Sequence, residues 1–184
     1  MTDIDALLRS TGALMEGHFQ LASGRHSGTY IEKFRIMEDP VATTALCGLI
    51  AARFRDAGAG VVVGPAMGGV ILAFETARQL GIRSVFAEKD AGGRLVFDRG
   101  FAVAPGERVL VVDDVLTTGG SVKQVLALLR DLRADVVGVG FLVDRTAGGV
   151  DFGVPFFACH RLAIDSYEAG ECPLCVQGLE LVET

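Results

Sequence analysis

The chain has 184 residues, half of them hydrophobic and 22% charged, which excludes a disordered protein and predicts a single domain with a sizeable buried core. Its formal net charge is −6, and this acidic balance argues against a nucleic-acid-binding protein, because such binding needs a surplus of Lys and Arg. The sequence shows no secretory-type apolar start and no apolar run of membrane-spanning length, so we expect a soluble, cytoplasmic protein that does not bind membranes.

The first part of the chain predicts two helices separated by a hairpin. Apolar residues within the first sixteen positions predict a short amphipathic helix, and residues 18–36 predict a strand, a polar turn and a second strand. Asp39 and Pro40 predict the start of the next helix, because Asp is a common N-cap and Pro fits the first helical position. We expect that helix to end near Gly58.

From residue 61 onward, short apolar runs alternate with helical patterns. The expected strands cover residues 61–64, 84–87, 108–113 and 136–143, and the expected helices cover 70–80 and 119–133. Continuous apolar runs predict strands buried on both faces, and their alternation with helices predicts a parallel sheet. The predicted fold class is therefore α/β, in one domain over residues 1–184. We expect a core over 40–158, with helices flanking the sheet, and a small hood formed by residues 1–36 and roughly 160–184.

The strongest functional signal is the segment from Val109 to Ser121. Ligands of open α/β sheets bind beyond the carboxyl ends of the strands, and here an apolar run ends in the paired carboxylates Asp113 and Asp114. The hydroxyl- and glycine-rich loop that follows opens a helix, where backbone N–H groups and the helix N-terminus favour a phosphate. The two carboxylates are placed to accept hydrogen bonds from a vicinal diol or to bind a metal. A phosphorylated sugar satisfies both parts of the segment.

Other interpretations of this segment are weaker. The two acids alone are compatible with caps of the following segment, and the loop with a plain turn, but the combined thirteen-residue pattern favours function. A nucleoside triphosphatase is disfavoured because the sequence has no G-x-x-x-x-G-K-[ST] loop, and a dinucleotide-binding fingerprint is missing as well.

The segment resembles the phosphoribosyl pyrophosphate (PRPP) motif of type I phosphoribosyltransferases. The resemblance implies the fold of that family, a parallel sheet flanked by helices with a small hood. It also implies an enzyme that binds PRPP with Mg²⁺, releases pyrophosphate from C1 of the ribose and joins a nitrogen base there. By this resemblance the ribose hydroxyls lie on Asp113 and Asp114, and the 5-phosphate lies in the loop of Thr117, Thr118, Gly119, Gly120 and Ser121.

Three further segments are similar to orotate phosphoribosyltransferases. Residues 17–30 resemble the hood segment with its F-x-L-x-S-G-x-x-S core, residues 64–69 resemble the pyrophosphate loop, and residues 141–145 resemble the strand end whose arginine binds the orotate carboxylate. An arginine also suits an anionic base, because its planar fork matches a carboxylate, whereas a salt bridge to Asp144 or a solvated charge is the alternative. The resemblance assigns PRPP to Met67, Gly68 and Gly69, and orotate to Thr117, Arg145, Tyr30 and Ser23.

This chain departs from the orotate pattern at several charged positions. Many orotate enzymes carry lysine or arginine at three positions that here hold Ala22, Gly68 and Glu88. Lys89 matches the family's position, so we expect it to be the catalytic and PRPP-binding cation that meets the leaving pyrophosphate, beside the paired acids. Arg94 and Arg99 are further candidates, with ordinary surface charges as the alternative. In the family this cation commonly reaches the neighbouring subunit's active site, which implies a homodimer.

The four cysteines are too few for a disulfide framework, so we expect thiols or metal ligands. Cys47 lies in an apolar helical pattern and is expected in the core. Cys159, with the adjacent His160, and the pair Cys172 and Cys175 form a candidate zinc set near the C-terminus. Free or redox-labile thiols are the alternative, because Cys159 and His160 lack the usual spacing between zinc ligands.

Two alternatives to an orotate enzyme stay open. A purine phosphoribosyltransferase shares the PRPP motif, although Arg145 and the hood segment disfavour it. A regulator that keeps the PRPP site to sense nucleotides while it binds RNA is disfavoured by the acidic charge.

Overall fold

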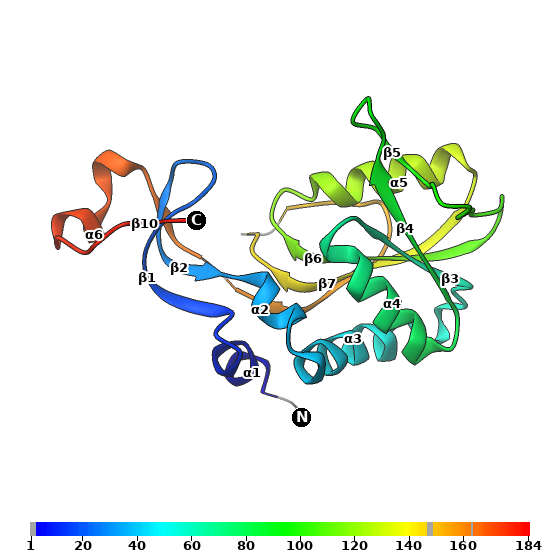
Figure 1. Cartoon of the computed structure of the whole chain (residues 1–184), viewed down its shortest axis with the longest axis horizontal. Coiled ribbons are helices and arrows are strands. Elements are labelled where there is room, and N and C mark those ends of the chain that lie inside the picture. Colours follow the sequence, from blue (N-terminus) through cyan, green and yellow to red (C-terminus); the bar gives the residue numbers. More distant parts are fainter. Residues whose placement is uncertain (1–2, 147–148, 163) are drawn as a thin grey trace.

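Two β-sheets divide the protein into a core and a smaller lobe (Figure 1). The structure is a computed structural model that describes residues 3–146, 149–162 and 164–184. The larger sheet has six strands in the order β5-β4-β3-β6-β7-β8, and the smaller sheet has four in the order β10-β1-β2-β9. The lobe lies to the left of the core in Figure 1, and the C-terminus lies within it.

The strands of the larger sheet are parallel except at one edge. The parallel strands are β3 (Val61–Pro65), β4 (Arg83–Lys89), β6 (Arg108–Leu116), β7 (Asp135–Asp144) and β8 (Phe156–Arg161). The two-residue strand β5 (Leu95–Val96) pairs antiparallel with β4. The predicted α/β fold with a parallel sheet is confirmed.

Helices cover both faces of this sheet. Helices α3 (Pro40–Phe54) and α4 (Gly68–Leu80) share one hydrophobic cluster with Val62, Leu110 and Val112, whereas α5 (Gly120–Asp131) shares the other with Val61 and Val111. Neighbouring residues of a strand point to opposite faces, so β-branched and apolar runs such as those of β3 and β6 serve both clusters. The apolar runs of these two strands, residues 61–63 and 109–112, are therefore continuous, as the sequence predicts.

The lobe is built from both ends of the chain. Its N-terminal part contains β1 (Leu14–Gln20) and β2 (His26–Ile31), followed by the short helix α2 (Lys33–Met37) that leads back to the core. Its C-terminal part contains β9 (Ser166–Tyr167), the 3₁₀ turn η2 (Ala169–Glu171), α6 (Pro173–Val176) and β10 (Val182–Glu183). Because β2 pairs with β9 and β1 pairs with β10, the C-terminal segment flanks the N-terminal hairpin on both sides.

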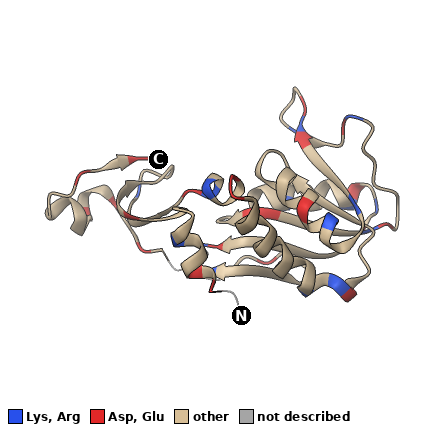
Figure 2. Cartoon of the chain, turned by 60° about the horizontal axis from the view of Figure 1, so that its bottom comes forward, with Lys and Arg blue, Asp and Glu red and all other residues tan. Residues whose placement is uncertain are grey.

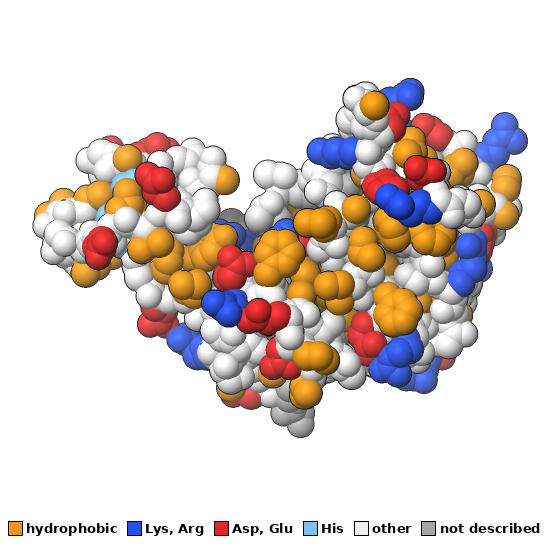
Figure 3. Space-filling model, viewed as in Figure 1, with side chains coloured by type: hydrophobic (Ala, Val, Ile, Leu, Met, Phe, Trp, Pro, Cys, Tyr) orange, Lys and Arg blue, Asp and Glu red, His pale blue; other side chains and the backbone are white. Residues whose placement is uncertain are grey.

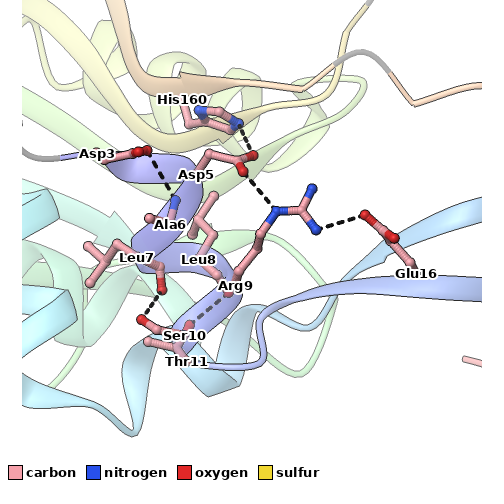
Figure 4. Close-up of polar contacts among 10 residues, drawn as sticks. All are labelled: Asp3, Asp5, Ala6, Leu7, Leu8, Arg9, Ser10, Thr11, Glu16 and His160. Atoms are coloured by element: carbon pink, nitrogen blue, oxygen red, sulfur yellow. Dashed lines mark hydrogen bonds and ion pairs between the residues drawn. The ribbon is translucent and has the colours of Figure 1, made fainter.

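The first helix, α1 (Ile4–Ser10), joins the lobe to the core through polar contacts (Figure 4). Arg9 lies between two carboxylates, with its Nε 2.8 Å from Asp5 Oδ2 and its Nη1 2.7 Å from Glu16 Oε1 on β1. Asp5 also lies 3.9 Å from His160 Nε2 on β8, and buried Leu8 packs into the core. Exposed ion pairs of this kind contribute little individually, so the apolar contact of Leu8 dominates.

The structure corrects the predicted elements in several places. The first helix ends at Ser10 rather than near residue 16, because Gly12 adopts a φ of 71° and the chain then enters β1. The second strand ends at Ile31, and Glu32 caps α2 by accepting a hydrogen bond from the Phe34 N–H. Strand β6 continues to Leu116, and the larger sheet contains two strands that were not predicted, β5 and β8.

The predicted helix start at Asp39 and Pro40 is confirmed. The Asp39 carboxylate accepts hydrogen bonds from the N–H groups of Val41 and Ala42. The helix runs to Phe54, a 3₁₀ turn η1 (Arg55–Ala57) follows, and Gly58 ends it with a φ of 68°. Cys47 of this helix is fully buried in the core, as predicted.

Acidic and basic residues are interspersed along the ribbon (Figure 2). Within the described part of the chain, no helix is both long and apolar enough to cross a membrane.

Glycines in β7 allow α3 to lie close to the sheet. A Cβ at Gly138 would lie 2.3 Å from Phe54 Cε1, and a Cβ at Gly140 would lie 2.5 Å from Ile50 Cγ2. Both separations are too short for real carbon atoms, so any side chain there must displace α3.

We expect Gly140→Ala to lower the free energy of unfolding by about 1–3 kcal/mol, because the added methyl group overpacks the interface with α3. Gly60→Ala is the matched control. Its Cβ would lie 3.9 Å from the nearest atom, so we expect a change of less than about 0.5 kcal/mol. Urea unfolding followed by circular dichroism measures both, and an equal effect of the two substitutions would contradict the packing explanation.

Candidate active site

The carboxyl ends of β3, β6 and β7 meet the end of the hairpin at a cavity of about 390 Å³. This cavity is lined by residues from the lobe, the β3–α4 loop, β6, the loop after it and the segment after β7. They include Tyr30, Lys33, Met67, Gly68, Asp113, Asp114, Thr117, Ser121 and Arg145. The edge of the sheet at which ligands of α/β proteins bind is thus also where the predicted motifs converge.

Two adjacent carboxylates line this cavity. Asp113 and Asp114 are only 8% and 5% exposed, and both lie within β6 rather than in the loop after it. The Asp114 N–H donates to Asp113 Oδ1 at 2.9 Å, and the Val115 N–H donates to Asp114 Oδ1 at 2.6 Å. These bonds orient the carboxylates but leave further oxygen lone pairs for a ligand.

The pKa of Asp113 is raised to about 7, mainly by burial and secondarily by the negative charge of Asp114. The Asp114 N–H and the Lys33 ammonium oppose this rise. Near neutral pH the Asp113 carboxyl therefore exchanges readily between its neutral and charged forms. A ligand that brings hydrogen-bond donors or a cation into the cavity stabilises the charged form of this carboxyl.

Lys33 is a cavity residue that the sequence analysis missed. Its Nζ lies 2.8 Å from Asp114 Oδ2, and it is the first residue of α2. The sequence places several charged side chains between residues 32 and 38, and the prediction of a continuous strand there gave no reason to single out one of them. Only the turn into α2 brings this ammonium group to the paired acids.

The β3–α4 loop packs directly against the acids because its residues are small. A Cβ at Gly64 would lie 2.1 Å from the Gly69 carbonyl oxygen, and a Cβ at Gly68 would lie 2.0 Å from Asp114 Oδ2. A side chain at position 68 would therefore require the Asp114 carboxylate or the loop to move. Met67 is the N-cap residue of α4 and is 76% exposed at the cavity rim. No side chain caps this end of the helix.

The loop between β6 and α5 forms a second, smaller cavity of about 290 Å³. All five predicted phosphate ligands line it, namely Thr117, Thr118, Gly119, Gly120 and Ser121. Gly119 has a φ of 74° and lies against Phe152, so only glycine suits this position. No side chain caps the N-terminus of α5, so its first N–H groups and the positive end of the helix dipole are available to an anion.

Arg145 follows β7 and lies between the main cavity and a third one of about 670 Å³. Its Nε is buried and has no hydrogen-bond partner among the described residues, and burial lowers the pKa of its guanidinium. The alternative of a salt bridge to Asp144 is not seen: Asp144 accepts hydrogen bonds from Thr146 and lies 3.7 Å from Arg161. A buried, unpartnered guanidinium nitrogen indicates a site for an anion.

The third cavity brings the remaining predicted base-binding residues to Arg145. Tyr30 from β2, Ser23 from the hairpin turn and Thr117 all line it. Ser166 of β9 and Thr184 at the C-terminus line it too, although the sequence analysis gave them no role. Both come from the C-terminal segment, which was expected in the hood, but the sequence pattern did not indicate which of its residues reach the cavity.

The predicted loop cations lie away from these cavities. Lys89 is the exposed last residue of β4, and the β4–β5 hairpin projects from the top of the core in Figure 1. Arg94 lies 3.1 Å from Asp90, and Arg99 lies 2.9 Å from Glu88. A single chain does not bring Lys89, Arg94 or Arg99 to the paired acids.

The predicted zinc set is wrong in one cysteine and in its histidine. Cys159 is packed against α3, with its Sγ 3.3 Å from the Leu46 carbonyl oxygen, and burial raises its pKa to about 12. His160 lies beside Asp5. Cys172 and Cys175 instead lie with His18 and His26 in the lobe.

Comparison with known proteins decides the family. Residues 38–152 match the family model described as phosphoribosyl transferase domain. An orotate phosphoribosyltransferase from Chlorobium phaeobacteroides is 47% identical over 175 residues, which is 95% of this chain and 90% of that protein. The chain belongs to the orotate phosphoribosyltransferase family. The predicted resemblance is confirmed, and so is the prediction of an enzyme of this type.

Solved structures agree with this family. The crystal structure of orotate phosphoribosyltransferase from Aeropyrum pernix is 28% identical, with a TM-score of 0.75 over 86% of this chain and 93% of that chain. An adenine phosphoribosyltransferase from Thermoanaerobacter pseudethanolicus shares the fold at 20% identity, with a TM-score of 0.64 over 73% of this chain and 88% of that chain. Since both kinds of enzyme share the fold, the side chains at the base end of the cavity must decide the base.

The raised pKa of Asp113 predicts that this carboxyl lowers the free energy of unfolding by an amount that depends on pH. A carboxyl whose pKa is higher in the folded state than its ordinary value of ~3.9 binds more protons folded than unfolded, so stability falls as pH rises between the two pKa values. We expect Asp113→Asn to raise the free energy of unfolding by more than about 1 kcal/mol at pH 8, and by much less at pH 4.

Urea unfolding at the two pH values measures this difference. Asp131→Asn, at an exposed carboxylate at the end of α5, is the control and should change stability by less than about 0.5 kcal/mol at both. An Asp113→Asn protein that is no more stable than the original at pH 8 would show that burial of this charge is not costly.

Proposed function

We propose that this chain transfers the phosphoribosyl group of PRPP to orotate, forming orotidine 5′-phosphate and pyrophosphate for pyrimidine biosynthesis. The observation that carries the proposal is the buried, unpartnered Nε of Arg145, which shares one cavity with the paired acids of a PRPP motif. Membership of the orotate phosphoribosyltransferase family supports it.

PRPP extends across the first two cavities in this proposal. Its 5-phosphate lies in the loop of residues 117–121, where hydroxyls and the N-terminus of α5 face an anion. The ribose hydroxyls donate to Asp113 and Asp114. The pyrophosphate lies towards Met67, Gly68 and Gly69, at the N-terminus of α4, which adds a second positive helix end.

Orotate lies at the other end, between the main and third cavities. The Arg145 guanidinium binds its carboxylate, because a fork of N–H donors matches two carboxylate oxygens. Tyr30 of the lobe covers the orotate ring, and Ser23 and Thr117 supply hydroxyls at the edge of the ring.

Magnesium is the cofactor that the family implies, and the donor set fits it. Two carboxylates at an open cavity are the hard oxygen ligands that Mg²⁺ accepts, together with phosphate oxygens of a substrate. Asp113 and Asp114 are the residues that would face it. When bound, Mg²⁺ offsets the negative charge that develops on the leaving pyrophosphate.

The chain's own residues supply electrostatic stabilisation for the reaction. The C1–O bond to pyrophosphate breaks, the C1–N1 bond to orotate forms, and positive charge develops on the ribose between these events. The carboxylates of Asp113 and Asp114 stabilise that charge, and the N-terminus of α4 stabilises the departing anion. Orotate already loses its N1 proton readily, so no strong general base is required.

The substrates give a direct test. We expect the protein to consume orotate in the presence of PRPP and Mg²⁺, and to leave uracil and adenine unchanged. Arg145→Ala should raise the KM for orotate at least about tenfold, because a charge-assisted bidentate pair contributes ~1.5–3 kcal/mol. The KM for PRPP should change less than about threefold. The loss of orotate absorbance measures both.

The controls separate the base site from the PRPP site. Asp114→Asn should abolish turnover while the circular dichroism spectrum stays that of the original protein. An equal rise of both KM values in Arg145→Ala would contradict the assignment of Arg145. Consumption of adenine in place of orotate would support the purine alternative.

We also infer a homodimer in which the β4–β5 hairpin reaches the neighbouring active site. Large apolar side chains are exposed on α2, α3 and α4 and just before α4, and two of them, Phe34 and Met67, line the main cavity; the others are Val41, Ile71 and Phe74. Figure 3 shows apolar side chains gathered across this side of the molecule, next to a hollow between the lobe and the core. Exposed apolar surface of this kind favours association with a second copy.

The cytoplasmic location stays a prediction.

Mixed dimers test this arrangement. If Lys89 acts in the partner's site, Lys89→Ala and Asp114→Asn chains expressed alone are both inactive. Each mixed dimer then contains one complete site, so random co-expression restores about a quarter of the original activity. No recovery on mixing, with both variants dimeric by light scattering, would show that Lys89 does not act across the interface.

A further inference from the structure

The C-terminal segment of the lobe has almost no hydrophobic core of its own. Among the described residues, neither hydrophobic cluster includes a side chain beyond Ile164. Val176, Leu179, Leu181 and Val182 are all exposed. Short strand pairs of two residues each connect this segment to the hairpin. Small units of this kind usually need a disulfide or a metal to hold their structure.

Four metal-binding side chains come together where this segment meets the hairpin. They are His18 of β1, His26 of β2, and Cys172 and Cys175 at the start and within α6. One ligand atom from each lies within 4.8 Å of all the others. His18, His26 and Cys172 are buried, whereas Cys175 is exposed and leaves a route for an ion to enter.

The hairpin brings the two histidines into contact. Gln20 pairs with His26 across the strands, and beside the register shift between Glu16 and Phe19 the His18 ring contacts the His26 ring edge to face. Their rings are 4.9 Å apart. Cys172 and Cys175 have the C-x-x-C spacing that lets two thiolates of one tight turn bind the same ion. In Figure 3 pale blue histidine surface is visible within the left lobe.

The separations of the ligand atoms match a tetrahedral zinc site. Bond lengths of ~2.0–2.1 Å for Zn–N and ~2.3 Å for Zn–S place two nitrogens about 3.3 Å apart and a nitrogen and a sulfur about 3.6 Å apart. His18 Nε2 lies 3.0 Å from His26 Nδ1, 3.5 Å from Cys172 Sγ and 3.7 Å from Cys175 Sγ. Cys175 Sγ lies 3.3 Å from His26 Nδ1.

The second ring nitrogen of His18 supports the same conclusion. His18 Nδ1 lies 2.9 Å from the Leu179 carbonyl oxygen, and only a protonated Nδ1 can bond to a carbonyl. Nε2 is then the nitrogen with a free lone pair, and it faces the cysteines. A metal-bound histidine typically donates its other N–H to a carbonyl or carboxylate in this way.

We propose that His18 Nε2, His26 Nδ1, Cys172 Sγ and Cys175 Sγ bind one structural Zn²⁺ that fastens the C-terminal segment to the hairpin. Two thiolates and two imidazoles in tetrahedral arrangement select zinc over the oxygen-binding Mg²⁺ of the active site. Four protein ligands leave no open position for a substrate, so the ion stabilises the lobe and takes no part in the transfer reaction.

Metal analysis of the purified protein tests the proposal. We expect about one zinc per chain by mass spectrometry of the metal, and less than about a tenth of that in Cys175→Ser and in His18→Ala. Cys159→Ser is the matched control and should keep its zinc, because Cys159 faces Leu46 and not this cluster.

Cobalt substitution keeps the test independent of how well the variants fold. The original protein, stripped of metal and loaded with Co²⁺, should show the intense visible absorption of tetrahedral cobalt and a thiolate-to-metal charge-transfer band. Under chelation, amide exchange should increase in residues 166–184 and the hairpin and stay unchanged in α3.

Two results would overturn the proposal. One is a protein that holds well under one zinc per chain after growth and reconstitution with zinc. The other is a Cys172–Cys175 disulfide in protein prepared under reducing conditions, detected as a mass lower by two hydrogens, because a disulfide consumes both thiolates.

Discussion

Burial of two neighbouring carboxylates at the end of β6 is the constraint around which the active site is organised. Asp113 and Asp114 are almost inaccessible in a chain that already carries a net charge of −6, and the pKa of Asp113 reflects the cost. Neighbouring groups offset part of that cost. Gly64 and Gly68 let the N-terminus of α4 come against Asp114, and Lys33 brings an ammonium group to the same carboxylate. The resulting cavity combines two carboxylates, proposed to bind the ribose, with a positive helix end and Arg145, proposed to bind the anions.

The same constraint bears on position 68, where the chain has a glycine. A lysine side chain cannot occupy a position whose Cβ would overlap Asp114 Oδ2, unless the loop moves away from the acids. The cation beside Asp114 is Lys33, the first residue of α2. Because α2 directly follows the hairpin, the charge balance of the acids depends on how the lobe sits on the core. Folding of the lobe and the electrostatics of the site are therefore connected through one short helix.

The sequence predicted what depends on local pattern and missed what depends on long-range contact. Apolar runs such as Val61–Val63 identify strands because two buried faces require them, and Asp39 with Pro40 identifies a helix start because the capping bond is local. The proposed phosphate loop could be singled out because residues 117–121 are contiguous in the sequence. Lys33 and Asp114 are far apart in the sequence, as are His18 and Cys172, and no spacing rule links such pairs. Cys159 was grouped with Cys172 and Cys175 on proximity in sequence alone, but β8 places it against α3.

The lobe links the proposed zinc site to the selection of the base. Tyr30 and Ser23 belong to the hairpin, and Ser166 and Thr184 belong to the C-terminal segment, yet all four line the cavity beside Arg145. Thr184 Oγ1 donates to the Gln20 carbonyl oxygen at 2.8 Å, and Arg25 bonds to Ser166, so the two segments form one wall. Each hydrogen bond of this kind adds only about 0.5–1.5 kcal/mol to stability. An ion bound by two residues from each segment fixes their relative position, and through it the width of the pocket that receives a planar base.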